Sequence, residues 1–378
     1  MIIKNVLIYN EYKYFEEGNI YIKDGLFAEP FEEDDEIIDG QGCYAIPGLI
    51  DIHFHGCMGY DFCDGTQEAL KNIAKYEASR GITTIVPATM TLPAEYLMMI
   101  MANAGQYKNE EGAILGGINM EGPYISQEKK GAQLAKYVRK ANVEEFRKLQ
   151  QAANGLIKLC DLAPEEEGAM EFVEELSGEV RISLAHTGAS YDIAKEAYEK
   201  GACHLTHMFN GMTPFTHREP GVIGAAMDSE NVMVELICDG IHVHPAAVRA
   251  AFGMFGDDRI VFVSDSLKTM GVPDGTYQAG DYTVKVEGKY VTLPDGTIAG
   301  SNTNLLECMR TAVLDMDIPL ESAVACATIN PAKSVGIDDK YGSIEVGKVA
   351  NVVLLNYNLT LNEVILKGKA YNLTKKLE

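Results

Sequence analysis

The stretch LIDIHFHG, residues 49–56, joins an apolar run to two histidines that are two positions apart. Side chains of an extended strand alternate with a period of two, so His53 and His55 are expected on one face, together with Asp51. An isolated pair of this kind also fits a structural role, in which each ring only satisfies a hydrogen bond. The chain has 8 histidines in 378 residues, so the positions of the others decide between the two interpretations.

The composition is that of a globular protein with a large core. Hydrophobic residues make up 47% of the chain and charged residues 23%, which excludes a disordered protein. The formal net charge of −23 argues against nucleic acid or an anionic membrane as a partner. The chain shows no signal peptide, no bilayer-spanning apolar run and no C-x-x-C pair among its 8 cysteines. These features predict a cytoplasmic protein with reduced thiols.

Two kinds of pattern divide the chain into two predicted domains. Short alternating segments separated by Gly and Asp predict that residues 1–46 and 336–378 form a small β-sandwich domain. Between them, eight apolar runs alternate with amphipathic helical patterns, among them residues 67–81, 143–155 and 191–201. The count of eight, with no G-x-G-x-x-G fingerprint after any run, favours an α/β fold with a (β/α)8 TIM-like barrel over an open sheet. The predicted barrel spans residues 47–335.

Most of the histidines follow a predicted strand directly. They are His53 and His55 after the first run, His186 after the fifth, His204 and His207 at the sixth, and His242 and His244 after the seventh. Because a barrel enzyme carries its chemistry at the carboxyl ends of its strands, this clustering favours a functional interpretation. Alternation turns His204 away from the face of its neighbours, so we interpret it as structural.

Imidazoles and carboxylates at these strand ends predict a divalent-metal site. Neutral imidazole suits Zn, Fe, Ni or Co, and His53, His55, Glu121, His186 and His207 are the candidate ligands. Glu121 has an alternative role as a helix cap or an ion-pair carboxylate. Such a metal polarises a carbonyl and makes a water molecule more acidic, which predicts metal-assisted hydrolysis.

Asp265 supplies a further carboxylate at the same edge, after the eighth run. A carboxylate beside the metal site can take a proton from water and pass it to a leaving group. Its alternative role is an N-cap for the following helix.

Several longer motifs extend the pattern along nearly the whole chain. They read PGLIDIHFHG, MEGPYIS, AHTGAS, THMFNGM, HREPG, CDGIHV, VSDS and GSIEVGK. The chain resembles the amidohydrolase superfamily and, within it, the N-acetylglucosamine-6-phosphate deacetylases. H-x-H alone is common to many amidohydrolases, whereas MEGPYIS with HREPG and DGIHV is much more specific.

This resemblance implies roles for the metal site. Glu121, His186 and His207 correspond to the ligands of one divalent ion, Zn or Fe. His53 and His55 correspond to an H-x-H pair that only some members keep, and they leave open a second ion that Glu121 bridges. Asp265 corresponds to the residue that acts as catalytic acid and base.

The resemblance also implies a substrate site. Arg218 corresponds to the arginine that holds the sugar phosphate, for which a guanidinium is well suited. Asn210 and the Gly211 backbone add donors to the phosphate, and His242 contacts the substrate. Arg218 and His242 are implied to reach across the interface of a homodimer, so that the two active sites are shared.

The implied reaction is hydrolysis of the N-acetyl group of N-acetylglucosamine 6-phosphate, which gives glucosamine 6-phosphate and acetate. Gln133 departs from the family pattern, because that position usually carries a histidine that polarises the scissile carbonyl. A glutamine amide donates only a neutral hydrogen bond. Three alternatives therefore stay open: another N-acyl hexosamine phosphate, a cyclic amide or deaminase-type substrate, or a barrel that binds sugar phosphates without turnover.

Overall fold

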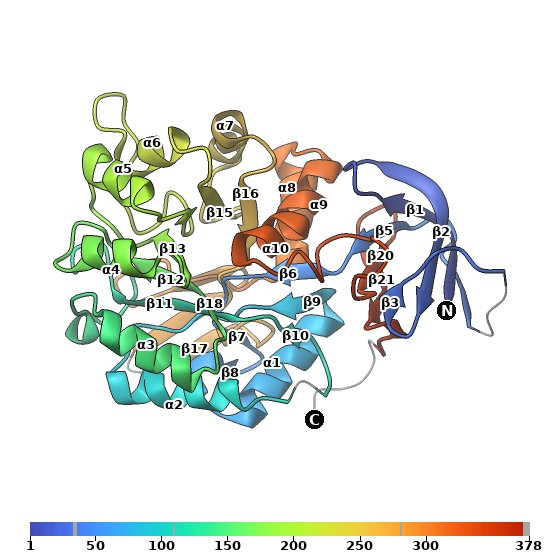
Figure 1. The fold of residues 1–378 in the computed structure, drawn as a ribbon, viewed down its shortest axis with the longest axis horizontal. Helices are drawn as coiled ribbons and strands as arrows, with labels where there is room; N and C mark the ends of the chain where they lie inside the picture. The colour runs from blue at the N-terminus through green and yellow to red at the C-terminus, as the bar shows by residue number, and fades with distance from the viewer. Residues whose placement is uncertain (33–35, 109, 280–281, 373–378) are drawn as a thin grey trace.

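The computed structural model describes residues 1–32, 36–108, 110–279 and 282–372. It contains a larger body of parallel strands and helices, and a smaller sheet at one end of this body (Figure 1). The predicted small domain extends to residues 33–35 and 373–378, which lie outside the described residues.

Both ends of the chain contribute strands to one eight-stranded sheet, here called the small sheet. Its strands are β1 (Ile2–Tyr9), β2 (Phe15–Lys23), β3 (Leu26–Phe27), β4 (Ile37–Asp39), β5 (Tyr44–Pro47), β20 (Val352–Leu355), β21 (Leu361–Leu366) and β22 (Lys369–Ala370). β5 pairs with β20 in antiparallel register, from Pro47 opposite Val352 to Tyr44 opposite Leu355. Because β5 and β20 are some 300 positions apart, their pairing joins the two ends of the chain in one sheet.

The parallel strands of the body form two sheets, in the orders β10-β9-β6 and β11-β12-β13-β14-β15-β16. These strands are β6 (Leu49–Asp51), β9 (Ile82–Ile85), β10 (Ile114–Leu115), β11 (Ile118–Tyr124), β12 (Ile157–Leu162), β13 (Arg181–Leu184), β14 (His204–Leu205), β15 (Met233–Ile237) and β16 (Ile260–Val263). Each predicted apolar run contains one of them, except that the third run is divided into β10 and β11. Strands buried on both faces read as continuous apolar runs, which explains why the sequence pattern located them.

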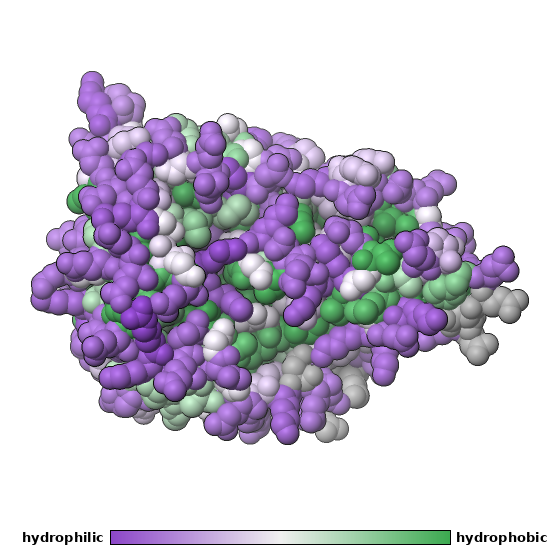
Figure 2. Space-filling view, in the orientation of Figure 1, coloured by the Kyte–Doolittle hydropathy of each residue, from purple (hydrophilic) through white to green (hydrophobic). Residues whose placement is uncertain are grey.

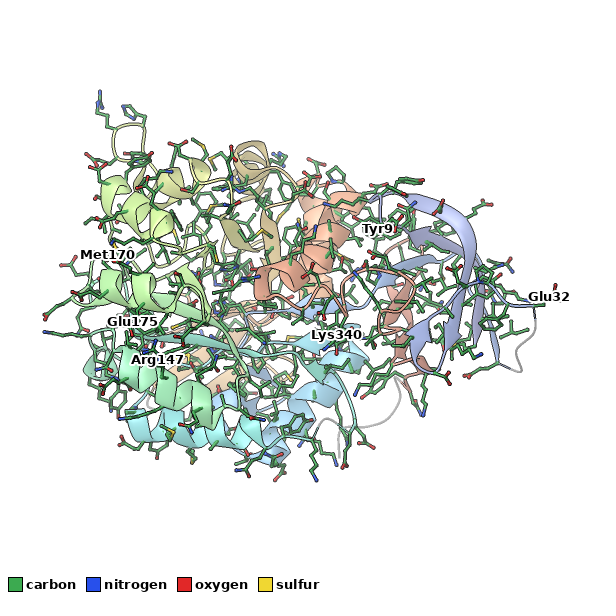
Figure 3. The ribbon with its side chains drawn as sticks, viewed as in Figure 1. Tyr9, Glu32, Arg147, Met170, Glu175 and Lys340 are labelled. Carbon is green, nitrogen blue, oxygen red and sulfur yellow. The ribbon has the colours of Figure 1, made fainter. Side chains whose placement is uncertain are left out.

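Gly48 marks the point where the chain leaves the small sheet and enters the body. The first apolar run is divided there, because β5 belongs to the small sheet and β6 to the body. A Cβ atom at Gly48 would lie 2.0 Å from Thr83 Oγ1 on β9. Only glycine therefore allows the two backbones to approach this closely. The Tyr9 hydroxyl makes a second connection, since it donates a 2.9 Å hydrogen bond to the Glu321 carbonyl at the junction labelled in Figure 3.

Helices follow most of the parallel strands and cover the body. They are α1 (Gln67–Ser79), α2 (Ala94–Gly105), α3 (Val143–Ala152), α4 (Ala169–Leu176), α5 (Tyr191–Glu199), α6 (Gly221–Met227), α7 (Pro245–Phe255), α8 (Leu305–Met316), α9 (Leu320–Ala327) and α10 (Ile329–Val335). The three helical patterns quoted for α1, α3 and α5 are confirmed. Within the described ranges, no helix combines the length and the apolar character needed to cross a membrane.

The helices present a polar face to solvent. Arg147 on α3 bonds Glu175 on α4 at 2.8 Å, and the two side chains lie close together in Figure 3. Both are about half exposed, so this pair adds little to stability. Figure 2 shows a mostly hydrophilic face, on which apolar side chains lie in furrows between polar ones.

A three-stranded antiparallel sheet after β16 was not predicted from the sequence. It consists of β17 (Gly275–Ala279), β18 (Tyr282–Glu287) and β19 (Tyr290–Thr292). Val284, Val286 and Val291 of this sheet pack against Leu267 and Ala299 in a separate apolar cluster. The available signal was the alternation of apolar and polar residues in YTVKVEGKYVTL, residues 282–293. A further hairpin, β7 (Gly56–Cys57) with β8 (Tyr60–Asp61), follows the H-x-H motif.

Glu77 on α1 generates a prediction about the pH dependence of stability. Burial, with repulsion from Asp51 next, raises the pKa of this carboxyl from 4.5 to about 8. The folded state therefore keeps a proton that the unfolded chain loses above pH 4.5, so stability falls as pH rises towards 8. Glu77→Gln should remove this loss, which amounts to at most about 1.4 kcal/mol per pH unit.

Urea unfolding of both proteins across this pH range measures the effect. The free energy of unfolding of the variant should increase relative to the wild type as pH rises. Glu68→Gln, which removes an exposed carboxylate from the same helix, controls for the loss of one charge. A difference between Glu77→Gln and wild type that stays constant with pH would contradict the assignment.

Candidate functional site

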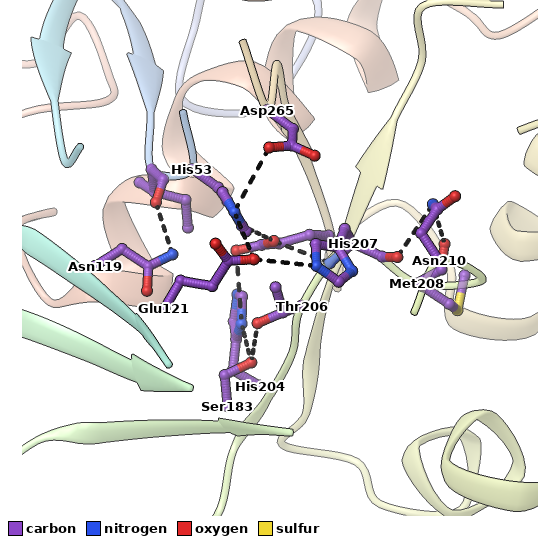
Figure 4. A network of polar contacts seen from close by, with 12 residues as sticks. His53, Asn119, Glu121, Ser183, His204, Thr206, His207, Met208, Asn210 and Asp265 are labelled. Atoms are coloured by element: carbon purple, nitrogen blue, oxygen red, sulfur yellow. Dashed lines mark hydrogen bonds and ion pairs between the residues drawn. The ribbon is translucent and has the colours of Figure 1, made fainter. Parts of the chain in front are cut away.

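Glu121 lies at the point where the predicted metal ligands converge. Its Oε1 atom is 3.1 Å from His186 Nε2, 3.4 Å from His207 Nε2 and 3.5 Å from His53 Nε2. Its Oε2 atom is 3.4 Å from His55 Nε2. All five side chains are buried, and Figure 4 shows His53 and His207 directed towards Glu121. The structure thus brings together every ligand that the sequence predicts.

Asp265 extends this arrangement into a second group. Its Oδ1 atom lies 3.3 Å from His55 Nε2 and 3.9 Å from His53 Nε2. Among the described residues, two sets of ligand atoms lie within 4.8 Å of one another: His53 with Glu121 and His207, and His53 with His55 and Asp265. Glu121 contacts both sets, because one carboxylate oxygen faces each.

The chemistry of these groups fits one or two divalent ions. Imidazole nitrogens and carboxylate oxygens are typical ligands of Zn and Fe. His53 Nε2 is fully buried and makes no hydrogen bond of good geometry with any described residue. A buried polar atom without a partner is costly, and a cation at this point would satisfy it.

Charge interactions shift the pKa values of the two carboxyls. Burial raises the pKa of Glu121, but hydrogen bonds with His186, His207 and His53 outweigh it and hold the pKa well below its ordinary value. Burial also raises the pKa of Asp265, but the hydrogen bond with His55 and the charge of His53 lower it overall. Asp265 is therefore ionised at neutral pH, as a proton acceptor must be.

Three of these side chains follow strands through backbone in the left-handed region. His186 has φ 44°, His207 has φ 29° and Asp265 has φ 49°. Such values are uncommon for residues with a Cβ atom and cost of order 1–3 kcal/mol each. At these positions the chain leaves its strand and the side chain joins the cluster around Glu121 and His55, so local strain accompanies the formation of the site.

Gln133 is held in a fixed orientation beside Glu121. Its Nε2 atom donates a 2.7 Å hydrogen bond to Glu121 Oε2, and its Oε1 atom accepts a 2.7 Å bond from the Thr91 backbone N–H. The side chain is buried. An amide nitrogen carries two hydrogens, so one N–H remains for a ligand.

A cavity of about 300 Å³ opens next to these groups. Gln133, Asn210, Gly211, His242 and Asp265 all contribute to its lining. None of the described residues that line it is lysine or arginine. The cavity thus has the size of a small-molecule site, but it has no permanent cation for a phosphate.

Gly211 and His242 are positioned by close contacts. A Cβ atom at Gly211, where φ is +59°, would lie 2.8 Å from His186 Nδ1. His242 Nδ1 is 2.7 Å from Asp239 Oδ2. Burial lowers the pKa of His242, but this hydrogen bond outweighs it and raises the pKa above its ordinary value. His242 Nε2 can therefore accept a hydrogen bond from a ligand in the neutral ring, or donate one when the ring is protonated.

Arg218 is the one predicted substrate-binding residue that does not line the cavity. Its side chain is exposed and is not part of the lining. It belongs to the segment before α6, which projects from the body at the upper left of Figure 1.

Sequence reasoning missed two carboxylates and misjudged one histidine. Glu235 bonds His53 Nδ1 at 2.9 Å, and Asp239 orients His242. A charged residue inside the apolar run VMVELI was the available signal for Glu235. The predicted orientation of His204 is wrong: its Nδ1 atom lies 3.0 Å from Ser183 Oγ and 3.9 Å from Glu235 Oε1, below the metal ligands (Figure 4). Burial lowers the pKa of His204 to about 4, so the ring is neutral and structural.

Comparison with known proteins identifies similar chains over the full length. The model of the amidohydrolase family matches residues 44–371. An N-acetylglucosamine-6-phosphate deacetylase of Bacillus subtilis is 35% identical, over 100% of this chain and 98% of that protein. An N-acetylgalactosamine-6-phosphate deacetylase of Escherichia coli is 31% identical, over 94% and 95%.

A solved structure is similar over the same extent. It is a mutant N-acetyl-D-glucosamine-6-phosphate deacetylase of Mycobacterium smegmatis in complex with N-acetyl-D-glucosamine-6-phosphate, with 28% identity and a TM-score of 0.90. The match covers 98% of each chain.

The contact between Gly211 and His186 generates a testable prediction. Gly211→Ala should push the His186 ring out of place, because the new Cβ atom would meet its Nδ1 at 2.8 Å. We expect a metal affinity about 10–100-fold lower, as for other changes that disturb ligand orientation. Metal content per chain after dialysis against a weak chelator measures this.

Gly288→Ala is a matched control. Gly288 has the same φ of +59°, and nothing lies within 4 Å of its added Cβ. Both variants should lose about 1 kcal/mol of stability from backbone strain. Equal metal contents in the two variants would show that the His186 contact does not matter.

Proposed function

The chain belongs to the amidohydrolase family, and we propose that it hydrolyses the N-acetyl group of N-acetylglucosamine 6-phosphate. The products are acetate and glucosamine 6-phosphate, as in amino-sugar catabolism. The observation that carries this proposal is Asp265, an ionised carboxylate that faces the cavity beside two groups of candidate metal ligands. The identity of the substrate is inferred from the names of the relatives given above.

The fold we propose for this reaction is a (β/α)8 barrel over residues 47–335, with a small β domain from residues 1–46 and 336–378. Backbone hydrogen bonds between the two parallel sheets support closure. The Asp265 N–H donates to the His53 carbonyl at 2.9 Å, and the Thr89 N–H donates to the Asn119 carbonyl at 2.9 Å. Closure brings the carboxyl ends of all strands to one rim, where the catalytic groups lie.

In the proposed mechanism, Glu121, His186 and His207 hold one divalent ion, Zn or Fe, and His53 and His55 are available for a second. An ion bound there supplies Lewis-acid chemistry at the amide carbonyl and increases the acidity of water. Asp265 accepts a proton from the attacking water and then donates it to the nitrogen of the leaving amino sugar. Its depressed pKa keeps it ready to accept this proton.

Gln133 and His242 are proposed to bind the substrate. The second N–H of Gln133 donates to the acyl oxygen, while the first holds Glu121. Asp239 holds the Nδ1–H of His242, so Nε2 accepts a hydrogen bond from a sugar hydroxyl when the ring is neutral and donates one when the ring is protonated. Asn210 and the Gly211 backbone also line the cavity and are proposed to bind the phosphate.

A second candidate substrate is N-acetylgalactosamine 6-phosphate. Two observations favour it: Gln133 replaces the histidine expected from the family pattern, and one relative acts on that sugar phosphate by name. The two sugars differ only in the configuration at C4, so the contacts of the sugar ring decide between them. A role in sugar-phosphate binding without turnover is disfavoured, since Asp265 is in place.

Acetate release from both sugar phosphates by metal-loaded protein tests the proposal. We expect turnover, with a higher kcat/KM for the glucosamine compound. Asp265→Asn should reduce kcat by about 10²–10⁴-fold, because it removes the proton acceptor. Its metal content should stay near that of the wild type. A protein that carries its metal and cleaves neither compound would contradict the proposed reaction.

Arg218 generates a prediction about the assembly. We propose that it reaches the cavity of a second copy in a homodimer, since its own cavity lacks a cation for the phosphate. A heterodimer of one Arg218→Ala chain and one Asp265→Asn chain then contains one complete site. After co-expression with two different tags, it should show about half of the wild-type activity, because the interface is isologous.

The two homodimeric variants are the controls for this experiment. If Arg218 instead acts in its own subunit, neither site of the heterodimer is complete. Its activity would then stay at the level of the weaker homodimers, and the proposed sharing of active sites would be wrong.

A further inference from the structure

Glu235 lies below the candidate metal ligands. It contacts His207, of the group Glu121, His186 and His207, and also His53, of the pair His53 and His55. It is on β15 and is completely buried. Its Oε2 atom is 2.9 Å from His53 Nδ1 and accepts a 3.0 Å hydrogen bond from the His207 backbone N–H. Its backbone carbonyl accepts a further 2.9 Å bond from the Met208 N–H. One residue therefore holds both the ring of His53 and the segment that carries His207.

The bond to His53 determines which nitrogen of that ring is free. A carboxylate only accepts hydrogen bonds, so His53 Nδ1 must carry the proton. A neutral imidazole has a single N–H, which leaves a lone pair on Nε2. That atom lies 3.5 Å from Glu121 Oε1 and 3.9 Å from Asp265 Oδ1. The free lone pair is thus directed to the place where a cation would be bound.

The bond to His207 supports a strained backbone. His207 has φ 29°, a value that is unfavourable for a residue with a Cβ atom. Its Nε2 atom lies 3.1 Å from His186 Nε2. The hydrogen bond from the His207 N–H to Glu235 Oε2 offsets part of this strain and keeps the ring directed at Glu121.

We propose that Glu235 is a positioning residue that selects the metal-binding tautomer of His53 and couples the two groups of ligands. This inference rests on the metal-dependent function proposed above. Ligand histidines are commonly oriented by a carboxylate on the other ring nitrogen, and loss of that carboxylate lowers metal affinity about 10–100-fold. Glu235 is unusual in that a single oxygen atom serves a ligand from each group.

Two conservative variants separate the position of this oxygen from its charge. Glu235→Gln removes the charge, but its amide oxygen can occupy the site of Oε2 and accept both hydrogen bonds. Its amide nitrogen then takes the place of Oε1, which faces His204 at 3.9 Å from Nδ1. Glu235→Asp keeps the charge but withdraws the acceptor by one carbon–carbon bond. If position matters, Glu235→Gln should bind metal more tightly than Glu235→Asp. If charge matters, Glu235→Asp should bind metal more tightly than Glu235→Gln.

Metal content and affinity are measured on the full chain after loading with Zn²⁺ and dialysis against a weak chelator. We expect Glu235→Gln to bind as many ions per chain as the wild type, with similar affinity. Glu235→Asp should bind Zn²⁺ about 10–100-fold more weakly. The unfolding temperature of each metal-free variant shows that the loss is not a failure to fold.

A His53→Asn background tests whether Glu235 acts through His53. There the His53 ligand is already absent, so Glu235→Asp should add little to the loss of an ion held by His53 and His55. Wild-type binding by Glu235→Asp, or an equal loss in Glu235→Gln, would overturn the inference. If Glu235→Asp does not fold, the Gln variant alone decides, because a loss there assigns the effect to charge. A wild-type protein that binds no Zn²⁺ or Fe²⁺ would instead contradict the proposed function, which is a distinct outcome.

Discussion

Glu121 Oε1 lies within 3.5 Å of three imidazole nitrogens, and the rest of the body is built so that this convergence occurs. The histidine ligands follow the ends of β6, β13 and β14, and Glu121 lies within β11; these strands are far apart in the sequence. Each strand has to end in the right register for its side chain to arrive, and parallel pairing along both sheets sets that register. An isolated carboxylate at this depth would be strongly unfavourable, so the histidines and Glu121 stabilise one another.

A shell of contacts keeps these groups in place. Gln133 bonds one oxygen of Glu121, Glu235 holds His53 and the backbone of His207, and Asp239 orients His242. Gly211 leaves room for the ring of His186. The unfavourable backbone of His186, His207 and Asp265 persists because neighbouring strands and this shell determine it together. Burial of the large apolar core around the strands offsets the free-energy cost of this strained backbone.

The distribution of charge separates the chemistry of hydrolysis from the recognition of an anion. A protein with a net charge of −23 repels a sugar phosphate at long range, so a local cation is needed. Asp265, the proposed proton acceptor, and most of the candidate metal ligands line the cavity, but no lysine or arginine is among its described residues. Arg218 lies on an exposed loop instead. This arrangement fits the proposal that a second copy of the chain completes the phosphate site.

Much of this organisation was accessible from the sequence, because its signals are local. Period-two alternation placed His53 and His55 on one face, apolar runs located the parallel strands, and helical periodicity located α1, α3 and α5. The resemblance carried by MEGPYIS, HREPG and DGIHV is confirmed by the family match over residues 44–371. The ligand set was therefore named before any contact was known, although its role in metal binding stays a prediction.

Only the tertiary structure decided which side chains meet. Glu235 contacts His53 across 182 positions, and no periodic pattern records such a distance. The orientation of His204 was predicted wrongly for the same reason, since alternation says which face a residue is on but not how a two-residue strand twists at its end. From the sequence, Gln133 was only a departure from the family motif. The structure shows that its side chain donates a hydrogen bond to Glu121. The physical reason is that sequence patterns reflect the local geometry of one element, while contacts at a strand edge depend on the register of every strand between them.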